Sequence, residues 1–365
     1  MRGIVSVSAL AGGVLLILGV LWDAFETAVL SRRVSRGTRL TTIFYRSTWP
    51  AWRLAAARIR SEQQRENFLT VFGPLSLLLL IAFWAFGLVL GFGMLFWGAG
   101  TRMQTPDGHV NFFVDLYMSG TTLFTLGIGD VTPTSPSARA ITVLESGIGL
   151  GFLALMISYL PVLSQAFSSR EVSISLLDAR AGSPPTGSEL LRRHGRDWEV
   201  GLEPLLRDWE RASAVLLESH VSFPVLAFYR SQHDNQSWVA AMTAILDSCA
   251  LIIAVVENGP VRQARLTFAM ARHAVTDLCY VLNLNPRAPQ PDRLSGTDFA
   301  ALRESLRQSG IALQPEPSSE RRFHELRGMY EPQVDALSRR LLMPLPPWVP
   351  MAAVYENWNA TAPER

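Results

Sequence analysis

The sequence predicts an all-α membrane protein with three transmembrane helices followed by a cytosolic helical bundle. Three observations indicate this fold: uncharged apolar runs long enough to cross a bilayer, an Arg-rich segment between the first two runs, and an evenly charged, helical second half. The segment between the second and third runs is too short to span, which predicts a re-entrant helix and loop. The expected parts are residues 1–30, 31–66, 67–170, 181–343 and 344–365.

The first two predicted spans follow from the positions of charged residues. Residues 3–22 form an uncharged run of 20 residues, which we expect to continue as helix to about residue 30. Residues 67–101 contain no charge in 35 positions. At about 1.5 Å of rise per residue, this second run exceeds the roughly 30 Å of bilayer hydrocarbon.

The segment 31–66 between these spans is strongly basic. Nine Arg against two Glu give it a balance of +7, which predicts a cytoplasmic location by the positive-inside rule. The amino terminus is then expected outside and the carboxyl half inside. Residues 38–60 mix aromatic residues with Arg, which predicts an amphipathic helix on the inner leaflet, broken at Trp49 and Pro50 and suited to anionic lipids.

Two acidic residues, Asp23 and Glu26, lie near the inner end of the first predicted helix. We expect them to form interfacial ion pairs with Arg32 and Arg33, which would anchor the helix at the lipid headgroups. A proton-sensing or ion-access role is the alternative.

The re-entrant segment is followed by the sequence T-L-G-I-G-D-V-T. Residues 111–124 are too short to span, and in lipid a non-helical backbone must be covered by protein or line a water-filled cavity. Gly127 and Gly129 reach positive φ at little steric cost, as a loop needs when it turns successive carbonyl oxygens toward one axis. Such oxygens replace the water shell of a cation. The residues expected to line the axis are Thr125, Leu126, Gly127, Ile128 and Gly129.

Asp130 follows at the expected outer mouth, where a carboxylate raises the local cation concentration. Because one loop per chain cannot form a ring, we expect a homotetramer.

The third predicted span, residues 140–167, carries one charge, Glu145. An intramembrane carboxylate is a functional candidate because its burial in lipid is costly. We expect its side chain to reach the back of the re-entrant helix at Thr121, Thr122 or Ser119 and to support the loop as a structural hydrogen-bond anchor. A direct role in gating or cation attraction is the alternative.

Gly149 and Pro161 are two points at which the third helix is expected to bend. Below them Leu163 and Phe167 could close a pore with a ring of apolar side chains. The alternative is a static bent helix whose glycines pack against a neighbour.

Residues 111–170 resemble the pore module of prokaryotic potassium channels. The resemblance rests on T-x-G-x-G-D, on Pro133 three residues after Asp130, on Arg139, and on Gly149, which stands 20 residues after Gly129. It implies conduction of K⁺ through the stretch from Thr125 to Gly129, with no cofactor and no metal beyond the permeant ion.

The sequence departs from this family at several filter positions. Leu126 replaces the usual Val, Ile128 replaces an aromatic residue, and Thr121 stands where some relatives place an acid. A weakly selective monovalent cation channel and a non-conducting membrane sensor therefore remain alternatives. A membrane enzyme is disfavoured because the three spans contain neither His nor Cys.

The second half is predicted to be a cytosolic helical bundle. Residues 180–365 have a net charge of −1, which gives no electrostatic reason to expect a nucleic-acid partner. Residues 181–188 form a predicted linker, and the expected helices are 189–219, 237–257, 261–283, 298–309 and 320–342. Residues 237–256 are apolar enough to suggest a fourth span, but Asp247 at their middle favours a buried bundle helix.

His273 and Asp277, one turn apart, are expected to form a surface pair and not a metal site. Cys249 and Cys279 are not expected to form a disulfide in a reducing cytosol. All 33 basic residues are Arg, which indicates GC-rich codons. These features favour the plasma membrane of a bacterium.

Overall fold

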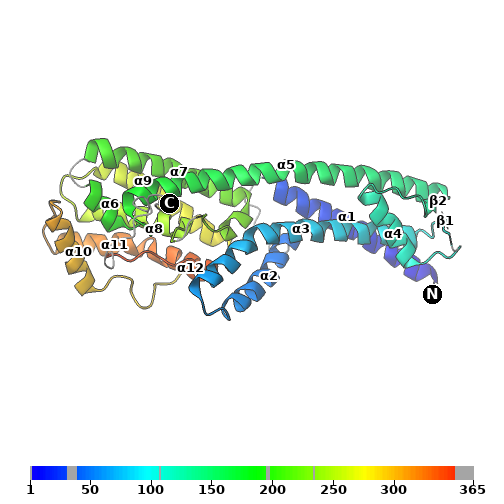
Figure 1. The fold of residues 1–365 in the computed structure, drawn as a ribbon, viewed down its shortest axis with the longest axis horizontal. Helices are drawn as coiled ribbons and strands as arrows, with labels where there is room; N and C mark the ends of the chain where they lie inside the picture. Colours follow the sequence, from blue (N-terminus) through cyan, green and yellow to red (C-terminus); the bar gives the residue numbers. More distant parts are fainter. Residues whose placement is uncertain (1, 31–38, 107, 195–197, 233–234, 350–365) are drawn as a thin grey trace, which may run out of the picture. The chain divides into compact units, whose positions relative to one another are not determined.

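The computed structural model describes residues 2–30, 39–106, 108–194, 198–232 and 235–349. Helices dominate these residues, which confirms the all-α class (Figure 1). The chain divides into two compact units, Met1–Ser164 and Gln165–Arg365. Helix α5 (Pro136–Ala181) contributes residues to both units. It begins four residues before the predicted third span and ends 14 residues after it.

Three helices are long and apolar enough to cross a membrane: α1 (Arg2–Ala28), α3 (Glu62–Gly98) and α5. They match the three predicted spans. Helices α1 and α3 lie side by side (Figure 1) and share a core that includes Val20, Trp84 and Leu88. Leu123 and Phe152 belong to the same core, so the short helix α4 (Phe112–Leu123) and α5 pack into it as well.

The expected helix break at Trp49–Pro50 was wrong, because helix α2 (Leu40–Ala56) continues through Pro50. Its aromatic side chains pack against α3: the ring centroids of Trp49 and Phe72 are 4.8 Å apart, and those of Trp52 and Phe68 are 4.3 Å apart. This packing stabilises the helix across a residue that lacks one backbone donor.

The two acids at the end of α1 contact α3 and the start of α2. Asp23 accepts hydrogen bonds from the indole Nε1 of Trp84 at 2.8 Å and from the backbone N–H of Thr41 at 3.0 Å. It thus caps the first turn of α2, for which the adjoining Arg39 provides no side-chain cap. Glu26 pairs with Arg39 at 3.2 Å. The predicted partners Arg32 and Arg33 lie outside the described residues.

Two short strands are the exception to the helical fold of this unit. Strand β1 (Met103–Gln104) pairs antiparallel with β2 (Thr132–Pro133), with Met103 opposite Pro133. This pairing joins the segment after α3 to the segment before α5. It therefore holds together the two ends of the stretch that contains α4 and the following loop.

The second unit contains short helices in place of some long predicted ones. Its described elements after α5 are α6 (Gly187–His194), η1 (Trp198–Leu202), α7 (Glu203–Ser222), η2 (Pro224–Phe228), α8 (Trp238–Ala254), α9 (Val261–Val281), α10 (Gly296–Gln308), α11 (Ser318–Gly328) and α12 (Glu331–Leu341). The predicted helix 320–342 is two helices because Pro332 occupies the first turn of α12, where a missing N–H costs little. Pro204 similarly lies in the first turn of α7, within the predicted helix 189–219.

Helix α8 forms the centre of this unit. All 17 of its residues are buried in the single chain, as the expectation of a bundle helix requires. Asp247 on α8 binds the guanidinium of Arg293 and accepts a hydrogen bond from Tyr330. Cys249 and Cys279 are free and buried, and burial raises the pKa of the Cys279 thiol to about 12.

The start of the predicted Pro-rich tail packs onto the second unit. Trp348 is buried, its carbonyl oxygen accepts a hydrogen bond from Ser188, and Arg293 donates to the carbonyl oxygen of Pro346. The rest of that tail, from residue 350 onward, lies outside the described residues.

Candidate functional site

The site is built on helix α4 and the loop that follows it. Asn111 begins the helix, because its side-chain oxygen accepts hydrogen bonds from the backbone N–H groups of Phe113 at 3.0 Å and Val114 at 3.1 Å. This is the usual way in which Asn satisfies the unpaired donors of a first turn. The predicted re-entrant helix, residues 111–124, agrees closely with α4.

Helix α4 ends in a C-terminal capping motif that sets the start of the loop. The N–H of Leu126 bonds to the carbonyl oxygen of Thr121 at 2.8 Å, and the N–H of Thr125 bonds to that of Thr122 at 3.1 Å. This pair of bonds is a Schellman motif, which requires a left-handed residue after the cap. That residue is Thr125, with φ of 56°. A β-branched residue in this conformation is strained by about 1–3 kcal/mol.

The sign of φ alternates along the loop. Thr125, Gly127 and Gly129 have φ of 56°, 57° and 84°, whereas Leu126 and Ile128 are not in the positive region. An added Cβ on Gly127 or Gly129 would meet no atom within 4 Å, so backbone conformation and not space favours glycine there. The sequence predicted positive φ for the two glycines but not for Thr125.

The loop lies exposed on the single chain. The side chains of Leu126 and Ile128 are each 62 % exposed, and the residues from Phe124 to Asp130 are all exposed. A non-helical segment at membrane depth needs cover from protein or a water-filled cavity. The single chain therefore leaves the candidate site incomplete.

The carboxylate of Asp130 is bonded to helix α4. The phenol of Tyr117 donates a hydrogen bond to Asp130 Oδ2 at 2.9 Å, and the backbone N–H of Val131 lies 3.0 Å from Asp130 Oδ1. The first bond joins the middle of α4 to the end of the loop. Tyr117 was not predicted as a site residue. The signal that could have identified it is a phenol in the re-entrant helix, close in sequence to Asp130.

Glu145 contacts α4, and its partner is Ser119. Ser119 Oγ lies 2.5 Å from Glu145 Oε1 and 2.9 Å from the carbonyl oxygen of Val89 on α3. The other two expected partners act differently. The hydroxyl of Thr121 donates within α4, to the carbonyl oxygen of Met118, and the carbonyl oxygen of Thr122 receives the Thr125 N–H.

Gly149 lies against the end of α4. A Cβ there would stand 2.6 Å from the carbonyl oxygen of Leu123, so only glycine permits this approach. The residue thus has a packing role, and its role as a hinge stays a prediction. Pro161 lies inside α5, which remains helical through it.

The two residues expected to form an apolar gate differ in exposure. Leu163 is buried, whereas Phe167 is half-buried and has its ring centroid 5.5 Å from that of Tyr229 in the second unit. Gating by these residues stays a prediction.

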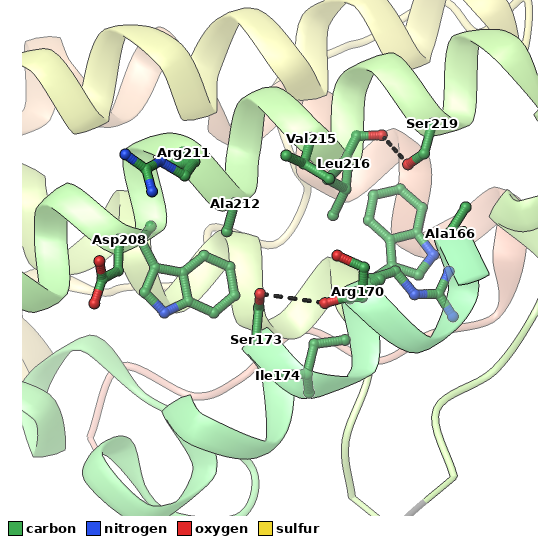
Figure 2. Close-up of a pocket in the computed structure, with 13 residues that line it drawn as sticks. Ala166, Arg170, Ser173, Ile174, Asp208, Arg211, Ala212, Val215, Leu216 and Ser219 are labelled. Atoms are coloured by element: carbon green, nitrogen blue, oxygen red, sulfur yellow. Dashed lines mark hydrogen bonds between the residues drawn. The ribbon is translucent and has the colours of Figure 1, made fainter.

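A groove of about 220 Å³ lies in the second unit between α5 and α7 (Figure 2). Ser169, Ser173 and Ser219 line it, and the hydroxyls of Ser173 and Ser219 donate to carbonyl oxygens of their own helices. Arg170 on its wall is already bonded to Glu171 and to two backbone carbonyls. The Arg170 guanidinium is therefore not free to bind an anionic ligand in the groove.

Among the described residues, no group of three or more His, Cys, Asp or Glu side chains could hold a metal ion. His273 and Asp277 form the expected pair on α9, with 3.3 Å between Nε2 and Oδ2.

Comparison with known proteins agrees with this geometry. Residues 76–163, from α3 to α5, match a family model described as ion channel. YdjJ, an uncharacterized membrane protein of Bacillus subtilis (strain 168), is 27 % identical over 197 residues, which are 50 % of this chain and 54 % of the relative. The chain thus spans about half the length of that relative. No solved structure matches the chain.

The family match confirms the resemblance of this segment to the prokaryotic potassium-channel pore. It supports a membrane ion channel and indicates a channel rather than an enzyme.

Proposed function

We propose that this ion-channel chain conducts K⁺ as a homotetramer, with the loop from Thr125 to Gly129 lining a shared axis. The observation that carries the proposal is the alternation of φ along that loop. Residues that alternate between left-handed and ordinary conformations can turn successive carbonyl oxygens to the same side, which a strand or helix cannot do. Carbonyl oxygens in such a row take the place of the water around a dehydrated cation.

The helix that carries the loop favours a positive ion. The C-terminal end of an α-helix carries a partial negative charge of about half an elementary charge, and α4 ends at Leu123, immediately before the loop. Asp130, held by Tyr117, adds a carboxylate at the other end. Both ends of the loop therefore attract cations.

The exposure of the loop supports assembly around it. Identical copies related by a closed rotation would cover the exposed residues of every loop at once, and a single axis lined by carbonyl oxygens suits four copies. Incomplete cover on one chain is the expected state of a subunit whose pore forms only between subunits.

The basic face of α2 supports a cytoplasmic location for the 31–66 segment in a bacterial plasma membrane, with the amino terminus outside. Arg46 and Arg53 on α2 are exposed, together with Ile43 and Leu54, and Arg58 just after the helix is exposed as well. Because this face combines cations with apolar side chains, it suits the anionic headgroups of the inner leaflet.

A weakly selective monovalent cation channel is the second candidate. It is favoured by Ile128, whose side chain has no hydroxyl group with which to brace the loop against a neighbouring helix. Selectivity depends on how firmly the coordinating oxygens are held, on their number, or on both. The Tyr117–Asp130 bond provides one brace at the outer end of the loop.

Flux measurements on the full chain in liposomes test the proposal. A K⁺ gradient should drive cation flux through the wild type, and replacing K⁺ with Na⁺ should lower it at least about tenfold, whereas Rb⁺ should still pass. Equal K⁺ and Na⁺ fluxes would favour the weakly selective channel.

Gly127→Ala and Gly19→Ala form a matched pair for this assay. An added Cβ at either position meets no atom within 4 Å, but Gly127 has positive φ and Gly19 lies in helix α1. Only Gly127→Ala should reduce the flux. An absence of flux in the wild type would contradict the channel function and favour a non-conducting sensor.

A further inference from the structure

Ser119 on α4 makes two contacts through one hydroxyl group. Its Oγ lies 2.9 Å from the carbonyl oxygen of Val89 and 2.5 Å from Glu145 Oε1. A carbonyl oxygen can only accept, and a serine hydroxyl carries a single hydrogen. If that hydrogen is donated to Val89, the contact with Glu145 must use a hydrogen that belongs to Glu145.

The surroundings of Glu145 favour its uncharged form. The side chain is fully buried, and its Oε2 has no hydrogen-bond partner in the part of the chain that the structure describes. An ionised carboxylate that is buried without a cation loses several kcal/mol of solvation, whereas a neutral acid loses far less.

Within the described ranges, no cation faces Glu145 from the elements packed around it. From residue 67 to its end, α3 has no charged residue, and the titratable groups of α4 are Asp115 and Tyr117. On α5 the nearest basic residue is Arg139, which is exposed and donates to the carbonyl oxygen of Pro133 at 3.2 Å. Asp115 is itself buried and is an acid, so it supplies no positive charge.

We propose that Glu145 is a positioning residue for the pore: as a neutral acid it donates to Ser119, which donates to Val89. This relay joins α5, α4 and α3, and it rests on the channel function proposed above. The carbonyl oxygens of Thr121 and Thr122, within three residues of Ser119, hold the first loop residues. A shift of α4 therefore moves the entrance of the loop.

The relay makes a distinctive prediction for substitutions of Glu145. The amide of Glu145→Gln still donates to Ser119, so K⁺ flux should stay within about twofold of the wild type. Glu145→Ala and Ser119→Ala each remove a bond and should lower the flux, or the K⁺/Na⁺ flux ratio, by about tenfold. The double variant E145Q/S119A should match S119A alone, because both changes act on one relay.

Alkaline pH supplies a second readout. Ionisation of Glu145 would remove its donated hydrogen, so wild-type flux should fall as the pH is raised from about 7 to about 10, while E145Q flux should not. A purely space-filling role for Glu145 would give the two proteins the same pH profile.

Infrared spectroscopy tests the relay without flux. The difference spectrum between wild type and E145Q at neutral pH should contain the carbonyl band of a protonated carboxylic acid. Asp115→Asn is the control for the buried carboxyl group of α4, and its spectrum should retain the Glu145 band.

A carboxylate band in place of the acid band, or E145Q flux as low as that of E145A, would overturn the relay. A wild-type chain without flux would overturn the channel function, and the infrared difference would still decide the state of Glu145.

Discussion

Asp247 and Glu145 are both carboxylates buried within a helix, but their neighbours differ in charge. Asp247 in the second unit receives two hydrogen bonds from the guanidinium of Arg293, at 2.6 and 2.9 Å, and one from the phenol of Tyr330 at 2.5 Å. For Glu145 in the first unit, the described residues supply one polar contact, with the hydroxyl of Ser119. The guanidinium of Arg293 stabilises an ionised Asp247, whereas the surroundings of Glu145 favour an uncharged carboxyl group.

The cation beside Asp247 is itself stabilised by the pairing. Burial alone lowers the pKa of Arg293, but the carboxylates of Asp247 and Glu331 raise it by more. Arg293 also lies over the ring of Trp348, with 4.7 Å between Cζ and the ring centroid. Asp247, which a guanidinium faces, therefore has a structural role, whereas Glu145, which no guanidinium faces among the described residues, is a candidate functional group.

The largest expected effect is a loss of stability when the partner of Arg293 is removed. Asp247→Ala leaves the buried Arg293 and Tyr330 without their shared partner, which should cost about 3–5 kcal/mol of unfolding free energy. For a unit of this size, the thermal midpoint should fall by about 10 °C or more. Circular dichroism of the full chain in detergent measures the midpoint.

Asp247→Leu combined with Arg293→Met is the control for that experiment. The double variant removes both charges and should recover part of the lost stability, since no uncompensated ion remains. If Asp247→Ala unfolds within about 2 °C of the wild type, the pair does not stabilise the second unit.

A change in the loop should have a smaller energetic effect but a specific functional one. Gly127→Ala places a Cβ on a residue with φ of 57°, at a cost of about 1–3 kcal/mol in the conducting conformation. Flux should fall about tenfold or more, while the thermal midpoint changes little because the loop is exposed. Wild-type flux in Gly127→Ala would show that positive φ at this position is not needed for conduction.

Near neutral pH, the smallest expected effect is that of His220 on the stability of the second unit, and it grows as the pH falls. Burial, together with the nearby Arg170 guanidinium, lowers the pKa of His220 from 6.5 to about 3. Because the unfolded chain binds this proton more readily than the folded one, stability should fall as the pH drops from 6.5 toward 3, by at most about 1.4 kcal/mol per pH unit.

His220→Gln tests that slope, since glutamine keeps hydrogen-bonding groups and does not titrate. Its unfolding free energy should depend less on pH between about 6.5 and 4 than that of the wild type. Parallel slopes for wild type and His220→Gln would exclude His220 as the source.

Features set by one continuous stretch of sequence could be predicted. The three spans followed from uncharged runs, and the loop followed from Gly127 and Gly129, which are suited to positive φ. The bundle character of α8 followed from a single acid at its middle, Asp247. In each case the residues that determine the feature lie within the element itself.

Features set by contacts between distant residues could not be predicted. Helix α2 continues through Pro50 because Trp49 and Trp52 pack against α3, and tertiary packing overrides local propensity. The left-handed Thr125 is held by bonds to the end of α4, against the preference of a β-branched residue. Which of Ser119, Thr121 and Thr122 contacts Glu145 depends on the rotation of α4 about its own axis.

Direct observation of the permeant ion in the assembled protein tests whether the loop from Thr125 to Gly129 lines a shared axis. Anomalous scattering from Rb⁺ in crystals of the reconstituted assembly would locate bound ions without reference to flux. For a tetrameric channel we expect a column of Rb⁺ peaks on a fourfold axis, coordinated by backbone oxygens between Thr125 and Gly129. A single-subunit assembly, or four subunits whose loops face away from the axis with no ion between them, would contradict this expectation.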